Sequence, residues 1–137
     1  MKVQKYIFRI SDKLFESLLE STGAVLVEGA KWCGKTQSSL QKAKSAIYLQ
    51  DPDEGPTYLA MADTKPSLLL EGSPPLLIDE WQIATVIWDA VRFAVDKRGL
   101  MGQFILTGSA TPADHETAHT GTGRIARMLM RPMSLFE

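Results

Sequence analysis

The chain has 137 residues, 45% of them hydrophobic and 23% charged, and its 15 Lys and Arg residues face 16 Asp and Glu residues for a formal net charge of −1. This length suits a single domain, and the composition excludes a disordered chain. The balanced charge excludes a global basic field that would indicate nucleic acid as the partner of this chain.

Cys33 is the only cysteine, which excludes an intrachain disulfide framework and favours a reducing compartment. His115 and His119 have no partners at metal-ligand spacing, so no zinc site is expected. No apolar run reaches the roughly 18 residues of a membrane span. We therefore expect one cytoplasmic domain over residues 1–137, without membrane contact.

The first half of the chain alternates predicted helices with short apolar runs. Residues 10–19 carry apolar side chains at helical spacing, and Ser11 is placed as the N-cap. Residues 24–28 form an apolar run of strand length, and the polar segment 37–44 predicts a partly exposed helix. A second strand is predicted at residues 46–49.

The turn sequence at residues 51–53, Asp-Pro-Asp, introduces the next helix, and the alternation then continues. The clearest helix is predicted at residues 83–95, where apolar residues follow the i, i+3, i+4, i+7 template and Gly99 ends the helix. The other predicted elements are a helix at 57–61, a helical turn at 66–70, a strand at 76–78, a strand at 103–107, a loop at 108–123 and a fifth strand at 124–136.

This alternation predicts an α/β fold with a parallel sheet and helices on both of its faces. In such sheets ligands bind outside the carboxyl ends of the strands. The residues that follow each predicted strand are therefore the candidates for function.

The segment GAKWCGKT, residues 29–36, follows the first predicted strand and fits the P-loop pattern. Its glycines let backbone N–H groups surround a phosphate, and the start of the next helix adds partial positive charge. Lys35 is placed to reach the β- and γ-phosphates, and Thr36 to bind Mg²⁺. The alternative, a chance glycine-rich turn, is disfavoured by the flanking strand and helix.

We expect nucleotide contacts along this whole loop and into the following helix. A reactive thiol at Cys33 is one interpretation, because helix N-termini activate thiols; a small loop residue without chemistry is the other. The expected nucleotide-binding residues are Gly29, Ala30, Lys31, Trp32, Cys33, Gly34, Lys35, Thr36 and Gln37.

The segment LLIDE, residues 76–80, is an apolar strand followed by two acids, which is the Walker B arrangement. Asp79 is placed to hold Mg²⁺, and Glu80 to activate the attacking water. Two solvated acids at a strand end are the alternative, which the upstream P-loop disfavours. We take Glu80 and Lys35 as the leading catalytic residues.

The two motifs together favour ATP hydrolysis over related activities. The chain contains no asparagine, so it lacks the Asn-Lys-x-Asp motif that reads guanine in GTPases. The second acid of the Asp-Glu pair also favours hydrolysis over phosphoryl transfer by a small-molecule kinase.

Polar residues near the last two predicted strands are further candidates. Thr107 and Ser109 stand where a polar group would detect the γ-phosphate, although strand-end turn residues are an equal interpretation. Arg124, Arg127 and Arg131 have the planar guanidinium that suits phosphate charge, and an arginine finger acts in cis or from a neighbouring subunit. A solvated basic face is the alternative for these arginines.

In this order, the segments GAKWCGKT, PPLLIDEWQ, GQFILTGSATP and HTGTGRIARMLMRPMSLFE resemble the N-terminal ATPase domain of a group of predicted prokaryotic AAA+ superfamily ATPases. The resemblance covers residues 9–137. It implies an ASCE-type P-loop NTPase fold, a three-layer sandwich whose parallel sheet has the strand order 5-1-4-3-2. It also implies ATP and Mg²⁺ as ligands, a sensor at residues 107–109, and a nucleotide-sensing or finger role for Arg124 and Arg127.

Members of this group continue into a C-terminal domain, and an AAA+ module normally closes a helical lid over its nucleotide. The resemblance therefore implies that residues 1–137 are a truncated ATPase domain. The leading interpretation is a domain that binds Mg·ATP, hydrolyses it to ADP and phosphate, and couples this reaction to a partner. That partner is the C-terminal domain, an unknown protein or a second copy in a homo-oligomer.

Two other functions stay open. The first is a nucleotide-dependent interaction switch with little turnover. The second is the ATPase part of a nucleic-acid-acting protein, in which other segments would hold the nucleic acid because this chain carries no net positive charge.

Overall fold

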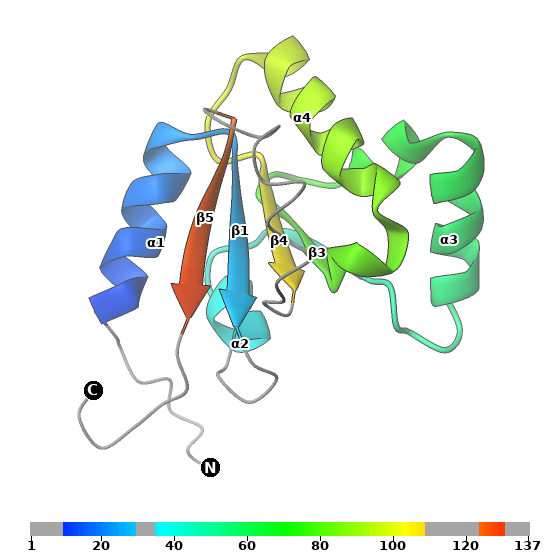
Figure 1. The fold of residues 1–137 in the computed structure, drawn as a ribbon, viewed down its shortest axis with the longest axis horizontal. Coiled ribbons are helices and arrows are strands. Elements are labelled where there is room, and N and C mark those ends of the chain that lie inside the picture. The colour runs from blue at the N-terminus through cyan, green and yellow to red at the C-terminus, as the bar shows by residue number, and fades with distance from the viewer. Residues whose placement is uncertain (1–9, 30–34, 109–123, 131–137) are drawn as a thin grey trace.

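The sheet of the protein is all-parallel. In the computed structural model, which describes residues 10–29, 35–108 and 124–130, five strands pair in the order β2-β3-β4-β1-β5 (Figure 1). This is the predicted order 5-1-4-3-2 read from the other edge, so the predicted fold class and topology are confirmed. The strands are β1 (Ala24–Gly29), β2 (Ser45–Tyr48), β3 (Leu76–Asp79), β4 (Phe104–Gly108) and β5 (Ile125–Met130).

Helices lie in the connections from β1 to β2, from β2 to β3 and from β3 to β4, because parallel strands need crossover connections. Two of these connections also contain a 3₁₀ helix, labelled η, beside the α-helix. The helices are α1 (Ile10–Ser21), α2 (Lys35–Leu40), α3 (Gly55–Thr64), η2 (Pro66–Leu70), η3 (Trp81–Ala84) and α4 (Val86–Arg98).

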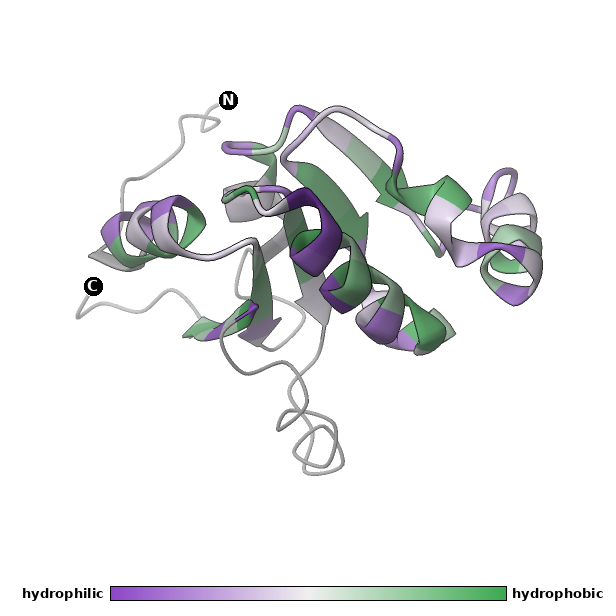
Figure 2. Ribbon diagram, turned by 90° about the horizontal axis from the view of Figure 1, so that it is seen from above, coloured by the Kyte–Doolittle hydropathy of each residue, from purple (hydrophilic) through white to green (hydrophobic). Residues whose placement is uncertain are grey.

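The helices form layers on both faces of the sheet. β1 is buried along its whole length, and its side chains alternate between the two faces. Val25 and Val27 pack on the side of α1, where Phe15 is buried, whereas Leu26 packs on the side of α4 with Ile87. Viewed from above, hydrophobic strand residues lie between the helices (Figure 2). A parallel sheet buried on both faces explains why its strands read as continuous apolar runs.

The helix predicted at residues 83–95 lies a few residues later in the structure. Residues 81–84 form the 3₁₀ helix η3, and α4 begins at Val86 and ends at Arg98 with Gly99 in the left-handed conformation (φ 65°). Ile87 and Val91 are fully buried, but Ile83 and Val86 are 40% and 44% exposed. The predicted start was wrong because the chain first turns sharply at Glu80, and the Ile83 N–H bonds to the Glu80 carbonyl (3.1 Å).

The remaining boundaries differ by a few residues from the prediction. α2 is shorter than the predicted helix at 37–44, and α3 is longer than the one at 57–61. The chain before α3 is ordered by Asp51, whose carboxylate accepts the N–H groups of Asp53 (2.7 Å) and Glu54 (3.1 Å). β5 occupies residues 125–130; Arg124, the first residue of the predicted strand, lies in a turn, and residues 131–136 lie outside the described residues.

One close contact ties α4 to the start of β1. A Cβ built on Gly23 would lie 2.3 Å from Val95 Cγ1, so only glycine lets the end of α4 approach this closely. Within the part of the chain that the structure describes, no helix has the length and apolar character needed to cross a membrane.

Candidate functional site

The candidate site lies at the carboxyl edge of the sheet, where β1, β3 and β4 end. Residues 30–34 of the P-loop sequence fall between β1 and α2 and are outside the described residues, as are the side chains of Lys35 and Gln37. Gly29 ends β1, and Thr36 lies in the first turn of α2. The two described ends of the loop therefore stand where the sequence predicted them.

Asp79, the last residue of β3, is the acceptor on which two hydroxyl groups converge. Thr36 Oγ1 donates to Asp79 Oδ1 (2.8 Å), and Thr107 Oγ1 donates to the same oxygen (2.7 Å). The three residues come from α2, β3 and β4, and Thr107 is fully buried. The parallel arrangement brings the ends of these elements together, so three residues predicted from separate motifs form one cluster.

Glu80 follows Asp79 with an unusual backbone. Among the described residues it is the only non-glycine with positive φ (φ 60°, ψ 54°). This left-handed conformation destabilises an L-residue by roughly 1–2 kcal/mol, and such strain persists where surrounding contacts hold it. Here the Glu80 N–H donates to Thr107 Oγ1 (3.0 Å), and the Glu80 carboxylate accepts from Gln82 Nε2 (2.7 Å).

A cluster of two tryptophans and an ion pair lies beneath this edge, on the face covered by α4. The buried rings of Trp81 and Trp88 are 5.1 Å apart. The Arg127 guanidinium lies 5.5 Å from the centre of the Trp88 ring and donates to Glu28 Oε2 (2.6 Å). Because Glu28 directly precedes Gly29, this ion pair joins β5 to the strand that leads into the P-loop sequence.

Gly108 completes the packing at the end of β4, opposite Glu28 on β1. A Cβ at this position would lie 2.7 Å from Gln82 Oε1 and 2.9 Å from Trp81 Nε1. The absence of a side chain therefore lets the Glu80–Gln82 segment lie directly against the end of β4.

Of the three arginines predicted as candidates, the two that the structure describes lie in different places. Arg127 is in the middle of β5, paired with Glu28. Arg124 precedes β5, its carbonyl accepts the N–H of Ala24 at the start of β1, and its side chain pairs with Asp96 of α4. The structure therefore places Arg124 away from the carboxyl ends of the strands, where the candidate site lies. Ser109, Arg131, His115 and His119 lie outside the described residues.

Reasoning from the sequence missed Gln82, Glu28 and the two tryptophans. Gln82 had a signal, since it stands two residues after the acidic pair in the segment IDEWQ. Glu28 had none, because an acid at the end of an apolar run is normally solvated. Its burial depends on a partner 99 residues later in the chain.

The oxygen ligands of this edge suit Mg²⁺ shared with a nucleotide. Among the described residues, no group of three or more His, Cys, Asp or Glu side chains could hold a metal by itself. Mg²⁺ typically takes one or two protein oxygens and completes its shell with phosphates and water. The Asp79 carboxylate and the Thr36 hydroxyl, 2.8 Å apart, are ligands of this kind.

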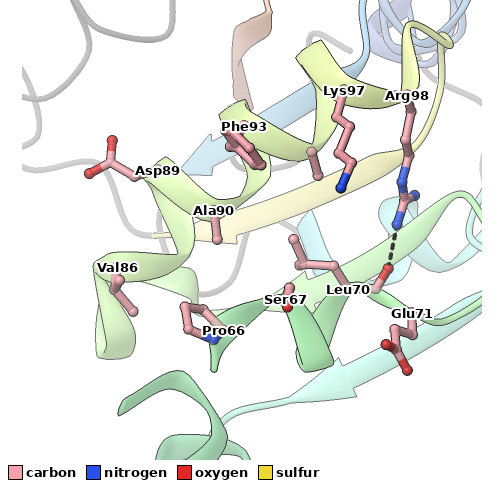
Figure 3. A pocket seen from close by; sticks show the side chains of 11 residues that line it. Pro66, Ser67, Leu70, Glu71, Val86, Asp89, Ala90, Phe93, Lys97 and Arg98 are labelled. Carbon is pink, nitrogen blue, oxygen red and sulfur yellow. Dashed lines mark hydrogen bonds between the residues drawn. The ribbon is translucent and has the colours of Figure 1, made fainter. Parts of the chain in front are cut away.

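A separate groove of about 650 Å³ lies between η2 and α4 (Figure 3). Its walls are largely apolar, with Pro66 and Leu70 on one side and Val86 and Phe93 on the other. Arg98 donates to the Leu70 carbonyl across one end (2.8 Å). None of the strand-end residues described above lines this groove, so it is not part of the candidate site.

The sheet order and the two motifs at its carboxyl edge define the fold of a P-loop NTPase. A family model described as "AAA domain" matches residues 21–137, and the chain belongs to this family of AAA domains. Membership indicates a nucleotide-binding function of the ATPase type. No curated protein matches the chain.

Proposed function

We propose that this chain is a domain that binds Mg·ATP, hydrolyses it to ADP and phosphate, and passes a conformational change to a partner. The observation that carries the proposal is the convergence of Thr36 and Thr107 on Asp79. It links the end of the P-loop sequence, the Walker B acid and the sensor strand through one carboxylate oxygen. Membership in a family of AAA domains supports the nucleotide class.

Each residue has a role in this proposal. Backbone N–H groups of residues 29–34 and the Lys35 ammonium bind the phosphates, and Thr36 and Asp79 hold Mg²⁺. Mg²⁺ supplies neutralisation of the charge that develops on the phosphates. Glu80 orients the attacking water and accepts its proton.

The sensor role belongs to Thr107 and Ser109. The Thr107 hydroxyl donates to Asp79 and accepts the N–H of Glu80, so a shift of this strand end would reach both acids. Arg127 is proposed to act on the loop through Glu28, whereas a finger role for Arg124 would require a neighbouring subunit. The partner is a C-terminal domain, another protein or a second copy of the chain.

Calorimetric titration of Mg·ATP, Mg·ADP and Mg·GTP into the chain tests binding, with Lys35→Ala as the control. We expect adenine-selective binding that Lys35→Ala weakens at least tenfold, because the ammonium contacts the phosphates. Equal affinity for ATP and GTP would contradict the assignment to ATP. Absence of binding by the folded chain would contradict the proposed site.

Phosphate release then separates an ATPase from a nucleotide-dependent switch. Glu80→Gln keeps the shape of the side chain but removes the base, so we expect turnover to fall at least 100-fold while Mg·ATP affinity stays within about threefold. A wild-type chain that binds Mg·ATP but releases no more phosphate than Glu80→Gln would identify the switch instead.

A further inference from the structure

We propose that Gln82 is a positioning residue that sets the Glu80 carboxylate for activation of the attacking water; this inference rests on the function proposed above. Gln82 Nε2 donates to Glu80 Oε1 (2.7 Å). The bond fixes one carboxylate oxygen, and with it the plane of the group that would accept the proton.

The backbone explains how two residues so close in sequence meet. Side chains at i and i+2 do not face each other on a helix. The left-handed conformation of Glu80 (φ 60°) redirects its side chain, and the 3₁₀ helix η3, which contains Gln82, begins directly afterwards. The strained backbone and the hydrogen bond from Gln82 therefore belong to one local arrangement.

The amide oxygen of Gln82 gives a second observation on how this side chain is oriented. Gln82 Oε1 is buried and has no hydrogen-bond partner among the described residues. Leaving a buried acceptor unsatisfied costs about 1–3 kcal/mol. Rotating the amide by half a turn would place this oxygen against the Glu80 carboxylate, so the bond to Glu80 fixes the orientation despite the unsatisfied oxygen.

Gly108 holds the amide from the other side. The position of a Cβ on Gly108 lies 2.7 Å from Gln82 Oε1, so the amide fits between the end of β4 and Glu80. The preceding residue, Thr107, accepts the N–H of Glu80 (3.0 Å). The end of β4 therefore fixes the backbone of Glu80 directly and its carboxylate through Gln82.

The test measures phosphate release and Mg·ATP binding for the wild-type chain, Gln82→Leu and the nearly isosteric Gln82→Glu. Loss of the donor removes the hydrogen bond from Gln82 that orients the carboxylate, and small misplacements of a reacting group cost up to about 100-fold in rate. We expect both variants to lower kcat at least tenfold while the Kd for Mg·ATP stays within about twofold. Gln82→Leu matters most, because it removes the donor without adding charge; Gln82→Glu keeps the shape of the side chain but places a second carboxylate against Glu80.

Two further variants show whether Gln82 acts through Glu80. In a Glu80→Gln background, Gln82→Leu should cause no additional loss of turnover, because residues that act as a unit are not additive. Gln103→Glu is the matched control: it makes the same amide-to-acid change at the other end of β4, where Gln103 accepts from Arg98 (3.0 Å). We expect its turnover to equal that of the wild type.

The outcomes are distinct. If the wild-type chain releases no more phosphate than Lys35→Ala, the proposed ATPase function fails and the role of Gln82 fails with it. If the wild type turns over and Gln82→Leu matches it or exceeds it, the ATPase function stands and the positioning role is overturned. Additive losses in the double variant would also overturn the positioning role.

Discussion

Asp79 Oδ1 accepts hydroxyl hydrogens from two elements at once, and this makes Asp79 the residue whose charge can be tested most cleanly. Asparagine has the same shape and keeps an oxygen that accepts both hydroxyls, so Asp79→Asn removes the negative charge with little change in packing. The variant therefore separates the role of Asp79 in the fold from its role toward Mg²⁺.

For Asp79→Asn we expect the affinity for Mg·ATP to fall roughly 10- to 100-fold, because the hard cation loses its carboxylate. The affinity for ATP in the presence of a chelator should change less than about threefold. Calorimetric titration under both conditions measures the two values. Equal losses of ATP affinity with and without Mg²⁺ would show that Asp79 shapes the site but does not bind the metal.

Among single residues, those that belong to motifs with fixed spacing could be predicted from the sequence. Thr36 and Asp79 were predicted from motifs 43 residues apart, and the structure joins them. The position of Gln82, two residues after the acidic pair, was visible in the sequence, but its contact with Glu80 could not be predicted because it depends on one left-handed residue. Glu28 could not be predicted either, because the strand that supplies Arg127 lies at the far end of the chain.

At the level of elements, the contact between α4 and the start of β1 depends on Gly23, whose side chain is a single hydrogen atom. Gly23→Ala would place a methyl group 2.3 Å from Val95 Cγ1, in a contact that is buried on both sides. Overpacking of this kind costs about 1–3 kcal/mol in the free energy of unfolding. We expect a cooperative unfolding transition at lower denaturant concentration.

A second substitution tests the cause of this loss. Val95→Ala removes both clashing methyl groups, so Gly23→Ala should destabilise the Val95→Ala chain clearly less than the wild type. Denaturant titration of the four chains measures the coupling. Equal effects of Gly23→Ala in both backgrounds would mean that backbone conformation, not the contact with Val95, explains the destabilisation.

The elements themselves were predicted with different success, for physical reasons. The strands are short apolar runs between turn residues, and all five appear near their predicted positions. The start of α4 was wrong because Ile83 and Val86 fit the apolar period yet face outward. Periodicity identifies an apolar stripe but does not reveal that 3₁₀ geometry interrupts it.

For the whole molecule, the two edges of the sheet at which the strands begin and end carry different charged residues. The carboxyl edge carries Asp79 and Glu80, whereas Arg124 lies at the opposite edge, beside the start of β1 and paired with Asp96. For Arg124→Ala we expect Mg·ATP affinity within about twofold of the wild type. Because this ion pair is largely exposed, we expect less than about 1 kcal/mol change in stability.

Titration at a concentration where the chain is monomeric, followed by thermal unfolding, measures both effects of Arg124→Ala. A tenfold loss of affinity in the monomer would contradict the placement of this arginine. A loss of turnover that appears only in assembled chains would show that Arg124 serves the site of a neighbouring subunit.

The sheet order also governs how a newly made chain acquires its structure. β1 is synthesised early, but its neighbours β4 and β5 begin only at Phe104 and Ile125. At roughly 5–20 residues per second, a ribosome needs several seconds after β1 to synthesise β4. Throughout this interval the apolar segment Ala24–Val27 lacks both strands with which it forms hydrogen bonds in the folded sheet. The nascent chain is therefore most prone to aggregate, and most dependent on chaperones, before β4 emerges.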